Sequence, residues 1–275
     1  NLRYIKVGQG PPLVLLHTLR TQLDMFQKVI PTLSQHFEVY ALDYPGHGFS
    51  DIPDAEYTPE LFIKSVAGFL EQVNVEHATV MGESIGGSIA LVLAARHNPR
   101  VLRVIAVNPY DYDQGRGLRR SSAIANVLFG LNNVPLIGST VTRLRQYPIF
   151  KKVMEGGVDR KEALPPALLR EMYEVGNRPH HYQAFMSLVS HWAEWEQARG
   201  EYNQIEVPVL LVYGDHDWSR PEEWEANQRA IPGAQMTIVP GAGHFLALDA
   251  PEALTQLILQ APSGPPGRKG LASPE

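Results

Sequence analysis

The chain has 275 residues, of which 44% are hydrophobic and 19% charged, a composition that fits a folded globular protein and excludes a disordered one. The formal net charge is -5 and no basic stripe with interleaved aromatic residues is found, so nucleic acid is not an expected partner. The absence of cysteine excludes disulfides, cysteine-based metal sites and a thiol nucleophile.

The first part of the chain alternates apolar runs with helical stretches. Strands are expected at 2–7, 13–16, 37–42, 78–81 and 101–108, and helices at 25–33, 59–73 and 85–97. The run 2–7 suggests the second arm of a hairpin, and Asp24 is a candidate N-cap for the helix that follows it. This alternation predicts an α/β fold, with a mostly parallel twisted sheet and helices on both faces.

The alternation stops at about residue 110. From 110 to 202 the sequence indicates helices and loops, with candidate helices at 121–131, 139–145, 165–175 and 180–196. Strands resume at 207–213 and 235–239, with helices expected at 221–230 and 251–259. We therefore predict a core built from 1–109 and 203–260, and a helical cap or lid over 110–202.

The two ends of the sequence bear on localisation. The chain opens at Asn1, directly before an expected strand, which leaves room for a leader or a first strand ahead of it. No signal peptide is visible and no apolar run approaches the roughly 20 residues of a membrane span. We expect no stable membrane insertion and a cytoplasmic location. The Pro/Gly/Ser-rich residues 261–275 are expected to be a disordered tail.

The clearest motif is Gly82-Glu83-Ser84-Ile85-Gly86, which follows an apolar run and precedes an Ala/Leu-rich one. This pattern is typical of a nucleophile elbow, a sharp strand-to-helix turn that exposes a serine hydroxyl. Glycines on both sides of the serine allow the crowded turn to close, because they carry no Cβ. An ordinary glycine-rich turn is the alternative for this stretch taken alone.

Two later loops bring further candidates to the same sheet edge. Asp217 follows the run 207–213, and His244 follows the run 235–239, so both lie with Ser84 at the carboxyl ends of predicted parallel strands. An imidazole titrates near working pH and can take the proton of a serine hydroxyl, and a carboxylate can orient that imidazole. Asp215 is the other acid in the same loop.

These motifs make the chain resemble the α/β-hydrolase fold superfamily over about residues 2–260. The matching segments are the loop at His17, Asp-x-Pro-Gly-His-Gly-x-Ser at 43–50, the elbow, Gly-x-x-Asp-x-x-x-Pro at 214–221 and Gly-x-Gly-His at 241–244. The resemblance implies a Ser84–His244–Asp217 triad, because the usual acid of the superfamily stands three residues after the glycine. Asp215 is then expected to brace the turn.

The resemblance also implies an oxyanion hole formed by the backbone N–H groups of Ile85 and Leu19. The loop departs from the usual pattern, however. Thr18 stands where glycine is usual, and Leu19 stands where an aromatic residue is common. The donor is therefore either the N–H of Leu19 or that of a neighbour in a loop of different shape.

Four residues are tentative substrate contacts: Thr18, Arg20, Tyr110 and Trp192. Arg20 is expected to pair with a substrate carboxylate if it faces the pocket, and it has no role if it faces solvent. His17 and His47 are expected to brace loops, and Glu83 is expected to make a solvent or structural contact. The histidines of 110–202 lack the spacing of a metal site, so no metal and no cofactor are expected.

The function expected from these residues is a serine hydrolase that cleaves small to medium carboxylic esters through an acyl-enzyme. The alternatives are a carbon–carbon bond hydrolase of aromatic degradation, which Arg20 would suit, and a lactonase or perhydrolase. A ligand receptor on the same fold belongs to a different class. The expected partner is a small-molecule ester, and the sequence leaves the oligomeric state open.

Overall fold

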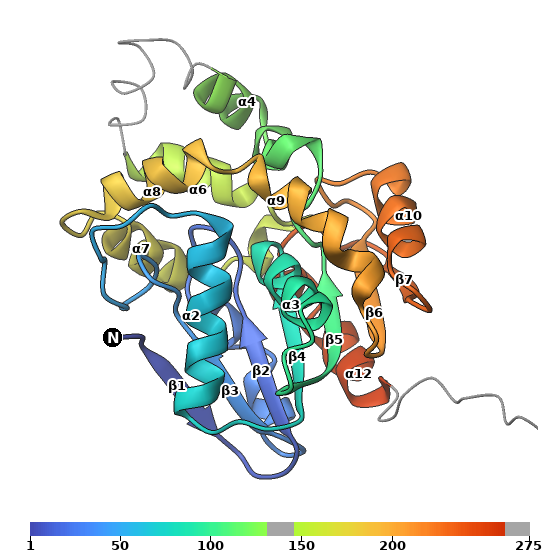
Figure 1. The fold of residues 1–275 in the computed structure, drawn as a ribbon. Helices are drawn as coiled ribbons and strands as arrows, with labels where there is room; N and C mark the ends of the chain where they lie inside the picture. The colour runs from blue at the N-terminus through green and yellow to red at the C-terminus, as the bar shows by residue number, and fades with distance from the viewer. Residues whose placement is uncertain (131–145, 262–275) are drawn as a thin grey trace, which may run out of the picture.

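A computed structural model describes residues 1–130 and 146–261 of the chain. The centre of the described part is a seven-stranded sheet in the order β1-β3-β2-β4-β5-β6-β7 (Figure 1). The strands are β1 (Tyr4–Val7), β2 (Pro12–Leu16), β3 (Glu38–Leu42), β4 (Ala78–Glu83), β5 (Val101–Val107), β6 (Val209–Gly214) and β7 (Gln235–Val239). β1 runs antiparallel to β3 and the other neighbouring pairs are parallel, which confirms the predicted sheet.

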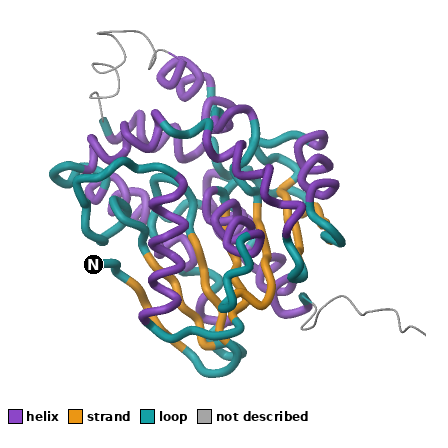
Figure 2. Tube along the Cα trace, in the orientation of Figure 1, coloured by secondary structure: helices purple, strands orange, loops and turns teal. Residues whose placement is uncertain are grey.

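Helices cover both faces of this sheet, as Figure 2 shows. Those of the core are α1 (Ile30–Leu33), α2 (Pro59–Gln72), α3 (Ile85–Ala95), α10 (Pro221–Ala230), α11 (Leu246–Asp249) and α12 (Pro251–Gln260). Val14 and Leu16 of β2 belong to the hydrophobic cluster that includes α2 and α3, whereas Leu13 and Leu15 belong to the cluster that includes α12. Successive strand residues thus point into opposite layers, and this explains the continuous apolar runs of the sequence.

Between β5 and β6 the described residues form helices and turns and no strand. The helices are α4 (Ala123–Gly130), α6 (Tyr147–Glu155), α7 (Pro166–Val175), α8 (His181–Ser190) and α9 (Glu194–Gln197), with 3₁₀ turns at Asp113–Gly115, Gly117–Arg120, Lys161–Ala163 and Ala198–Gln204. Figure 1 shows α4, α6, α8 and α9 grouped at the top of the molecule. The division of the chain into core and cap stays a prediction.

The structure corrects several local predictions. The expected helix over 180–196 is two helices, because the ring of His191 lies 2.8 Å from the Ser187 carbonyl oxygen at the end of α8 and the chain turns before α9. Helix α6 was not predicted at all. The candidate helix at 139–145 and the tail after residue 261 lie outside the described residues.

One prediction near the N-terminus is wrong and another is not tested. Asp24 is not an N-cap: its carboxylate pairs with Arg3 at 2.7 and 3.1 Å, and Gln22 stands at the cap position of a 3₁₀ turn, Leu23–Phe26. β1 pairs with β3, which is more than 30 residues away, at the edge of the described sheet. The first arm of the hairpin suggested for 2–7 would precede Asn1, so that suggestion stays a prediction.

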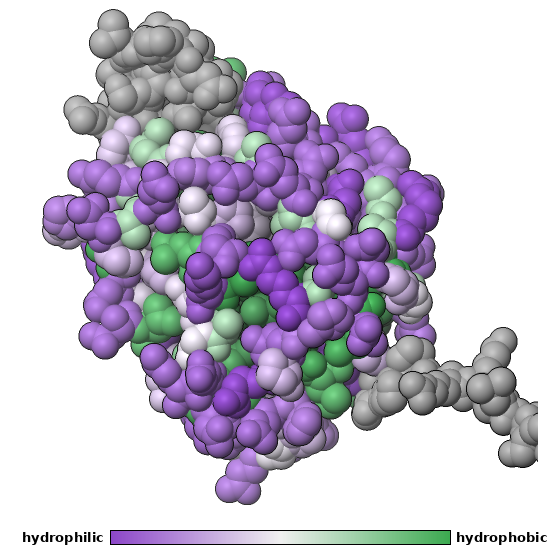
Figure 3. All heavy atoms as spheres, in the orientation of Figure 1, coloured by the Kyte–Doolittle hydropathy of each residue, from purple (hydrophilic) through white to green (hydrophobic). Residues whose placement is uncertain are grey.

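Hydrophilic residues predominate on the surface seen in Figure 3, and hydrophobic ones gather mainly in its middle and lower part. Most large apolar side chains are instead buried in the two clusters of the core. Among the helices of the described residues, none has both the length and the apolar character needed to cross a membrane.

Candidate active site

Ser84 stands at the turn between β4 and α3, where the sequence predicts an elbow. Its backbone has φ 61° and ψ −122°, outside the regions that most side chains adopt. A Cβ on Gly82 would lie 2.0 Å from the Gly86 carbonyl oxygen, and one on Gly86 would lie 2.2 Å from that of Leu16. Only glycine fits at either position, so the strand, the turn and the helix pack closely enough to hold Ser84 in this strained conformation.

The structure brings Ser84, His244 and Asp217 into one chain of contacts. Nε2 of His244 lies 2.8 Å from Oγ of Ser84, and Nδ1 of the same ring lies 2.5 Å from Oδ1 of Asp217. The His244 and Asp217 side chains are fully buried. In this arrangement the Nδ1–H group donates to the carboxylate, which leaves Nε2 free to accept the serine proton.

The two acids of the loop after β6 have different surroundings. The second carboxylate oxygen of Asp217 accepts the backbone N–H of Ser219 at 2.9 Å and is also bonded to the Ser219 hydroxyl. That hydroxyl in turn accepts from Nε1 of Trp224 at 2.6 Å. Asp215 is exposed and accepts the N–H of Ala242 at 3.3 Å. Its contact braces the loop, whereas Asp217 faces the imidazole.

The loop after β2 faces the elbow, and its backbone is held by its own side chains. The carbonyl of Thr18 accepts from Nδ1 of His17 at 2.8 Å and from the hydroxyl of Thr21 at 2.8 Å. Leu19 is buried in this loop, and Ile85 is the first residue of α3, where backbone N–H groups have no partner within the helix. The N–H groups of Leu19 and Ile85 as oxyanion donors stay a prediction.

His17 and His47 brace the loops around the site. Nε2 of His17 accepts the N–H of Tyr44 at 3.4 Å, and Nδ1 of His47 donates to the Pro45 carbonyl at 3.1 Å. Burial lowers the pKa of His17 to about 4 and that of His47 to about 3. Both rings are therefore neutral near pH 7 and act through hydrogen bonds.

Besides Thr18, the tentative substrate contacts are Arg20, Tyr110 and Trp192. The guanidinium of Arg20 lies over the ring of Phe185 at 4.8 Å and that of Phe150 at 5.5 Å, on helices α8 and α6, and the residue is half-buried. The Tyr110 ring lies 6.3 Å from that of His244, but its hydroxyl bonds the backbone of Gly115 and Leu118. Trp192, between α8 and α9, is half-buried against the larger hydrophobic cluster.

Asn108 is a site residue that the sequence reasoning missed. Its amide nitrogen donates to the carbonyls of Gly243 and His244 at 3.1 and 3.0 Å, and its oxygen accepts the N–H of Gly214 at 3.0 Å. The side chain therefore joins the ends of β5 and β6 to the loop that carries His244. The only sequence signal is a polar residue at the end of an apolar strand, which does not reveal these distant partners.

Glu83 precedes Ser84 and is fully buried, which excludes the solvent contact and leaves the structural one. One carboxyl oxygen accepts the N–H of Ala247 at 3.0 Å, and the other has no hydrogen-bond partner among the described residues. Burial raises the pKa of Glu83 to about 8. The carboxyl is therefore mainly protonated near neutral pH.

Because this pKa lies above its ordinary value of 4.5, the folded state binds the Glu83 proton more tightly than the unfolded state does. The group contributes stability below about pH 4.5, and that stability is lost as the pH rises towards 8. Glu83→Gln is thus expected to raise the melting temperature at pH 9 and to change it little at pH 5. Circular dichroism melts at both values test this, with exposed Glu76→Gln as the control. An equal effect of Glu83→Gln at the two pH values would contradict it.

Within residues 1–130 and 146–261, no group of three or more His, Asp or Glu side chains could hold a metal ion.

Comparison with protein families matches residues 11–251 to a family model described as "alpha/beta hydrolase fold". Two curated relatives show the chemistry found among similar chains. The pimeloyl-[acyl-carrier protein] methyl ester esterase of Nitrosomonas europaea is 27% identical, over 89% of this chain and 93% of its own. The 2-hydroxy-6-oxo-6-(2'-aminophenyl)hexa-2,4-dienoic acid hydrolase of Metapseudomonas resinovorans is 23% identical, over 91% and 83%.

A solved structure supports the same architecture. Cfl2 from Burkholderia cenocepacia superposes with a TM-score of 0.81 at 20% sequence identity, covering 95% of this chain and 92% of the Cfl2 chain. At this identity the likeness concerns the fold alone.

Proposed function

The chain belongs to the α/β-hydrolase fold family, and on that premise we propose that it is a serine hydrolase that cleaves small to medium carboxylic esters through an acyl-enzyme. The observation that carries the proposal is the chain of contacts from Ser84 through His244 to Asp217, at 2.8 and 2.5 Å. A hydroxyl, an imidazole and a buried carboxylate in this order form the arrangement that activates a serine.

The reaction proceeds in two halves. His244 takes the Ser84 proton as Oγ attacks the ester carbonyl, and the N–H groups of Ile85 and Leu19 stabilise the oxyanion. The carbon–oxygen bond to the alcohol then breaks, and the alcohol leaves with the proton from His244. Water attacks the acyl-serine, again with His244 as base, and releases the carboxylic acid and free Ser84. These steps need neither a metal nor a cofactor.

The size of the substrate is inferred from the segment 110–202, which we propose as a cap. Helices α6 and α8 of this segment contribute Phe150 and Phe185, which lie against Arg20 in the loop that faces the elbow. An apolar cover beside the site favours a molecule of limited size over a bulk lipid. The esterase relative from Nitrosomonas europaea supports the ester chemistry.

A nitrophenyl acetate assay, combined with a fluorophosphonate label, tests the proposal. Acylation that outpaces deacylation is expected to give a burst of nitrophenol close to one equivalent of enzyme. The label is expected on Ser84, located by peptide mass spectrometry, and Ser84→Ala is the control that should take up none. A protein that shows no turnover and no labelling would be a receptor on a hydrolase fold rather than an enzyme.

Arg20 favours a second candidate, the hydrolysis of carbon–carbon bonds in acidic substrates, which uses the same three residues. Its guanidinium lies over two aromatic rings of the proposed cap, and guanidinium groups bind carboxylates in two-point contacts. The relative from Metapseudomonas resinovorans is named for an acid of this kind. A lactonase or perhydrolase remains open on the same residues.

Arg20→Gln separates the two candidates. If the guanidinium binds a substrate carboxylate, KM for an anionic substrate is expected to rise about tenfold or more, since charge-assisted hydrogen bonds contribute a few kcal/mol. KM for a neutral ester of similar size should stay within about twofold. Steady-state kinetics on a matched pair of esters, with and without a terminal carboxylate, measure this. Arg20→Lys, which keeps the charge, is the control, and equal effects on both esters would remove the role in carboxylate binding.

A further inference from the structure

The imidazole of His244 is covered on one face by the indole of Trp218. The two ring centroids are 3.7 Å apart and the ring planes differ by 11°, so the rings are stacked. Trp218 is the residue directly after Asp217, and it is 8% exposed. The same short segment therefore supplies a carboxylate to the edge of the imidazole and an aromatic surface to its face.

The indole is itself held by the segment that we propose as the cap. Its Nε1–H donates to the Gly156 carbonyl at 2.7 Å, just after α6. The carbonyl of Trp218 accepts from the Arg120 guanidinium at 3.0 Å. Gly156 and Arg120, which are 36 positions apart in the segment 110–202, thus both bind Trp218. Gly156 contacts its ring and Arg120 contacts its backbone. Trp218 belongs to the loop after β6 that also carries Asp217, which we call the acid loop.

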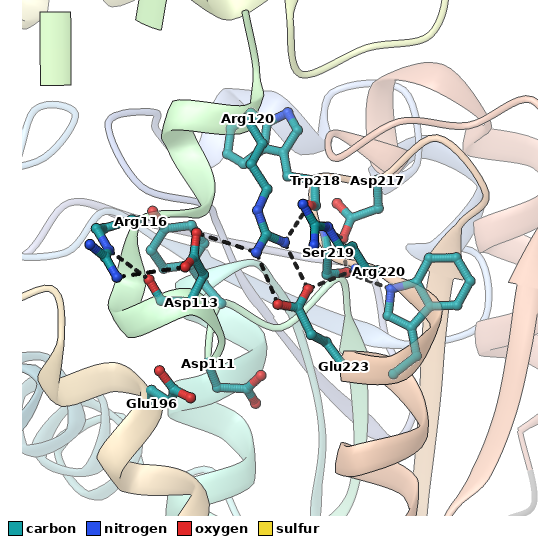
Figure 4. Close-up of polar contacts among 12 residues, drawn as sticks. Asp111, Asp113, Arg116, Arg120, Glu196, Asp217, Trp218, Ser219, Arg220 and Glu223 are labelled. Atoms are coloured by element: carbon teal, nitrogen blue, oxygen red, sulfur yellow. Dashed lines mark hydrogen bonds and ion pairs between the residues drawn. The ribbon is translucent and has the colours of Figure 1, made fainter. Parts of the chain in front are cut away.

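Arg120 is anchored on its other side, as Figure 4 shows. Its guanidinium makes a two-point contact with Glu223 at 2.8 and 3.1 Å, and it lies 3.3 Å from Asp113. Glu223 also accepts the backbone N–H of Arg220 at the start of α10. The end of the acid loop, where α10 begins, is therefore linked through Glu223 to the same arginine that binds the Trp218 carbonyl.

The loop that carries His244 contacts the same part of the proposed cap. The N–H of Phe245 donates to the Gly157 carbonyl at 2.7 Å. The carboxylate of Asp249 accepts both the N–H of Gly243 at 2.8 Å and that of Asp159 at 2.6 Å. Residues 156–159 therefore contact both the loop that carries the imidazole and the indole that covers it.

We propose that Trp218 is a positioning residue for His244: its ring fixes the plane of the imidazole, stabilises the imidazolium that forms in each half-reaction, and links both to the segment at Gly156. An aromatic face attracts a cation placed over it, and this favours the imidazolium. Asp217 is the charged group in contact with the imidazole, and the Tyr110 and Phe245 rings lie 6.3 and 5.8 Å from it. The inference rests on the proposed serine hydrolase.

Three variants separate the ring from its tether. Trp218→Phe keeps an aromatic face and loses the N–H, whereas Trp218→Leu loses both. Phe69→Leu is the control for lost packing, because Phe69 is a buried ring of α2 that packs on Tyr4 and Tyr40. Nitrophenyl ester kinetics give kcat, KM and the pH profile of kcat/KM for each variant.

In Trp218→Leu we expect kcat to fall about 10- to 100-fold with KM within about threefold, since a misplaced catalytic group costs up to about 100-fold. The acid limb of the profile should shift by about half a pH unit or more to lower pH, because the imidazolium loses its aromatic partner. In Trp218→Phe the acid limb should stay at the pH of the parent protein, and kcat should be close to that of the parent. An effect of Trp218→Leu confined to thermal stability, as in Phe69→Leu, would overturn the proposal.

A second measurement does not depend on turnover. In Ser84→Ala protein, the ring protons of His244 followed by NMR report its protonation directly. The titration midpoint is expected to fall with Trp218→Leu and to stay in place with Trp218→Phe, and equal midpoints would overturn the stacking role. If the wild-type protein fails the burst and labelling assays, the proposed hydrolase function is refuted. The titration still tests whether the Trp218 ring stabilises the charged form of His244. If circular dichroism shows that Trp218→Leu is unfolded, Trp218→Met replaces it.

Discussion

Ser84→Ala is expected to lower kcat/KM for a nitrophenyl ester by about 10⁴-fold or more, down to the rate left by binding and the oxyanion donors alone. In the proposed mechanism the hydroxyl oxygen is the atom that bonds the acyl group, so no neighbouring side chain replaces it. His244 Nε2, at 2.8 Å from that hydroxyl, then has no proton to accept. Initial rates at substrate concentrations well below KM measure the change.

The fold should survive this substitution, because the alanine methyl group occupies less space than the hydroxymethyl group it replaces. Circular dichroism and the melting temperature are expected to match those of the parent protein. Ser65→Ala is the matched control: Ser65 lies on α2 and its hydroxyl donates to the Leu61 carbonyl within the helix. A Ser84→Ala protein that retains a tenth of the parent activity would show that Ser84 is not the nucleophile.

Asp217→Asn is expected to reduce kcat about 10⁴-fold, with a much smaller change in KM. The amide is neutral and can donate towards Nδ1, so the imidazole is left in the wrong tautomer and its charged form loses its partner. The carboxylate is fully buried at 2.5 Å from His244 Nδ1, so water does not take its place. The value of kcat from steady-state kinetics and the rate of fluorophosphonate labelling should decrease together.

Asp215→Asn is the matched control, two residues away in the same loop. Its exposed carboxylate accepts one backbone N–H at 3.3 Å, a contact that an amide oxygen also makes. Activity is expected to remain within about threefold of the parent. A larger loss for Asp215→Asn than for Asp217→Asn would reverse the assignment of the acid.

Much of the fold could be predicted because its strands are short apolar runs separated by helices. A strand buried on both faces is mainly apolar along its whole length, and β2, β4, β5 and β6 are mainly apolar runs, with Thr79 and Glu83 in β4 and Arg103 in β5 as the polar exceptions. The predictions failed where local signals compete. Asp24 has the residue type of an N-cap, but a distant arginine takes its carboxylate.

Some residues of the candidate site could be identified from the sequence and others could not. Ser84, Asp217 and His244 could be singled out because each stands in a short motif with its own turn chemistry. Trp218 and Asn108 could not be found, and the partner of Glu83 could not be named, since the partners of all three lie 26 or more residues away along the chain. Their residue types alone do not distinguish a site contact from ordinary packing.

The sequence by itself determined the strand–helix alternation, the strained elbow at Ser84 and the order serine, acid, histidine, because these depend on residues close together in the chain. Only the tertiary structure decided which acid faces the imidazole, what covers that ring, and how the segment 110–202 reaches it through Gly156 and Arg120. Those contacts join residues that are distant in sequence, and their geometry follows from how the sheet and the helices pack around the site.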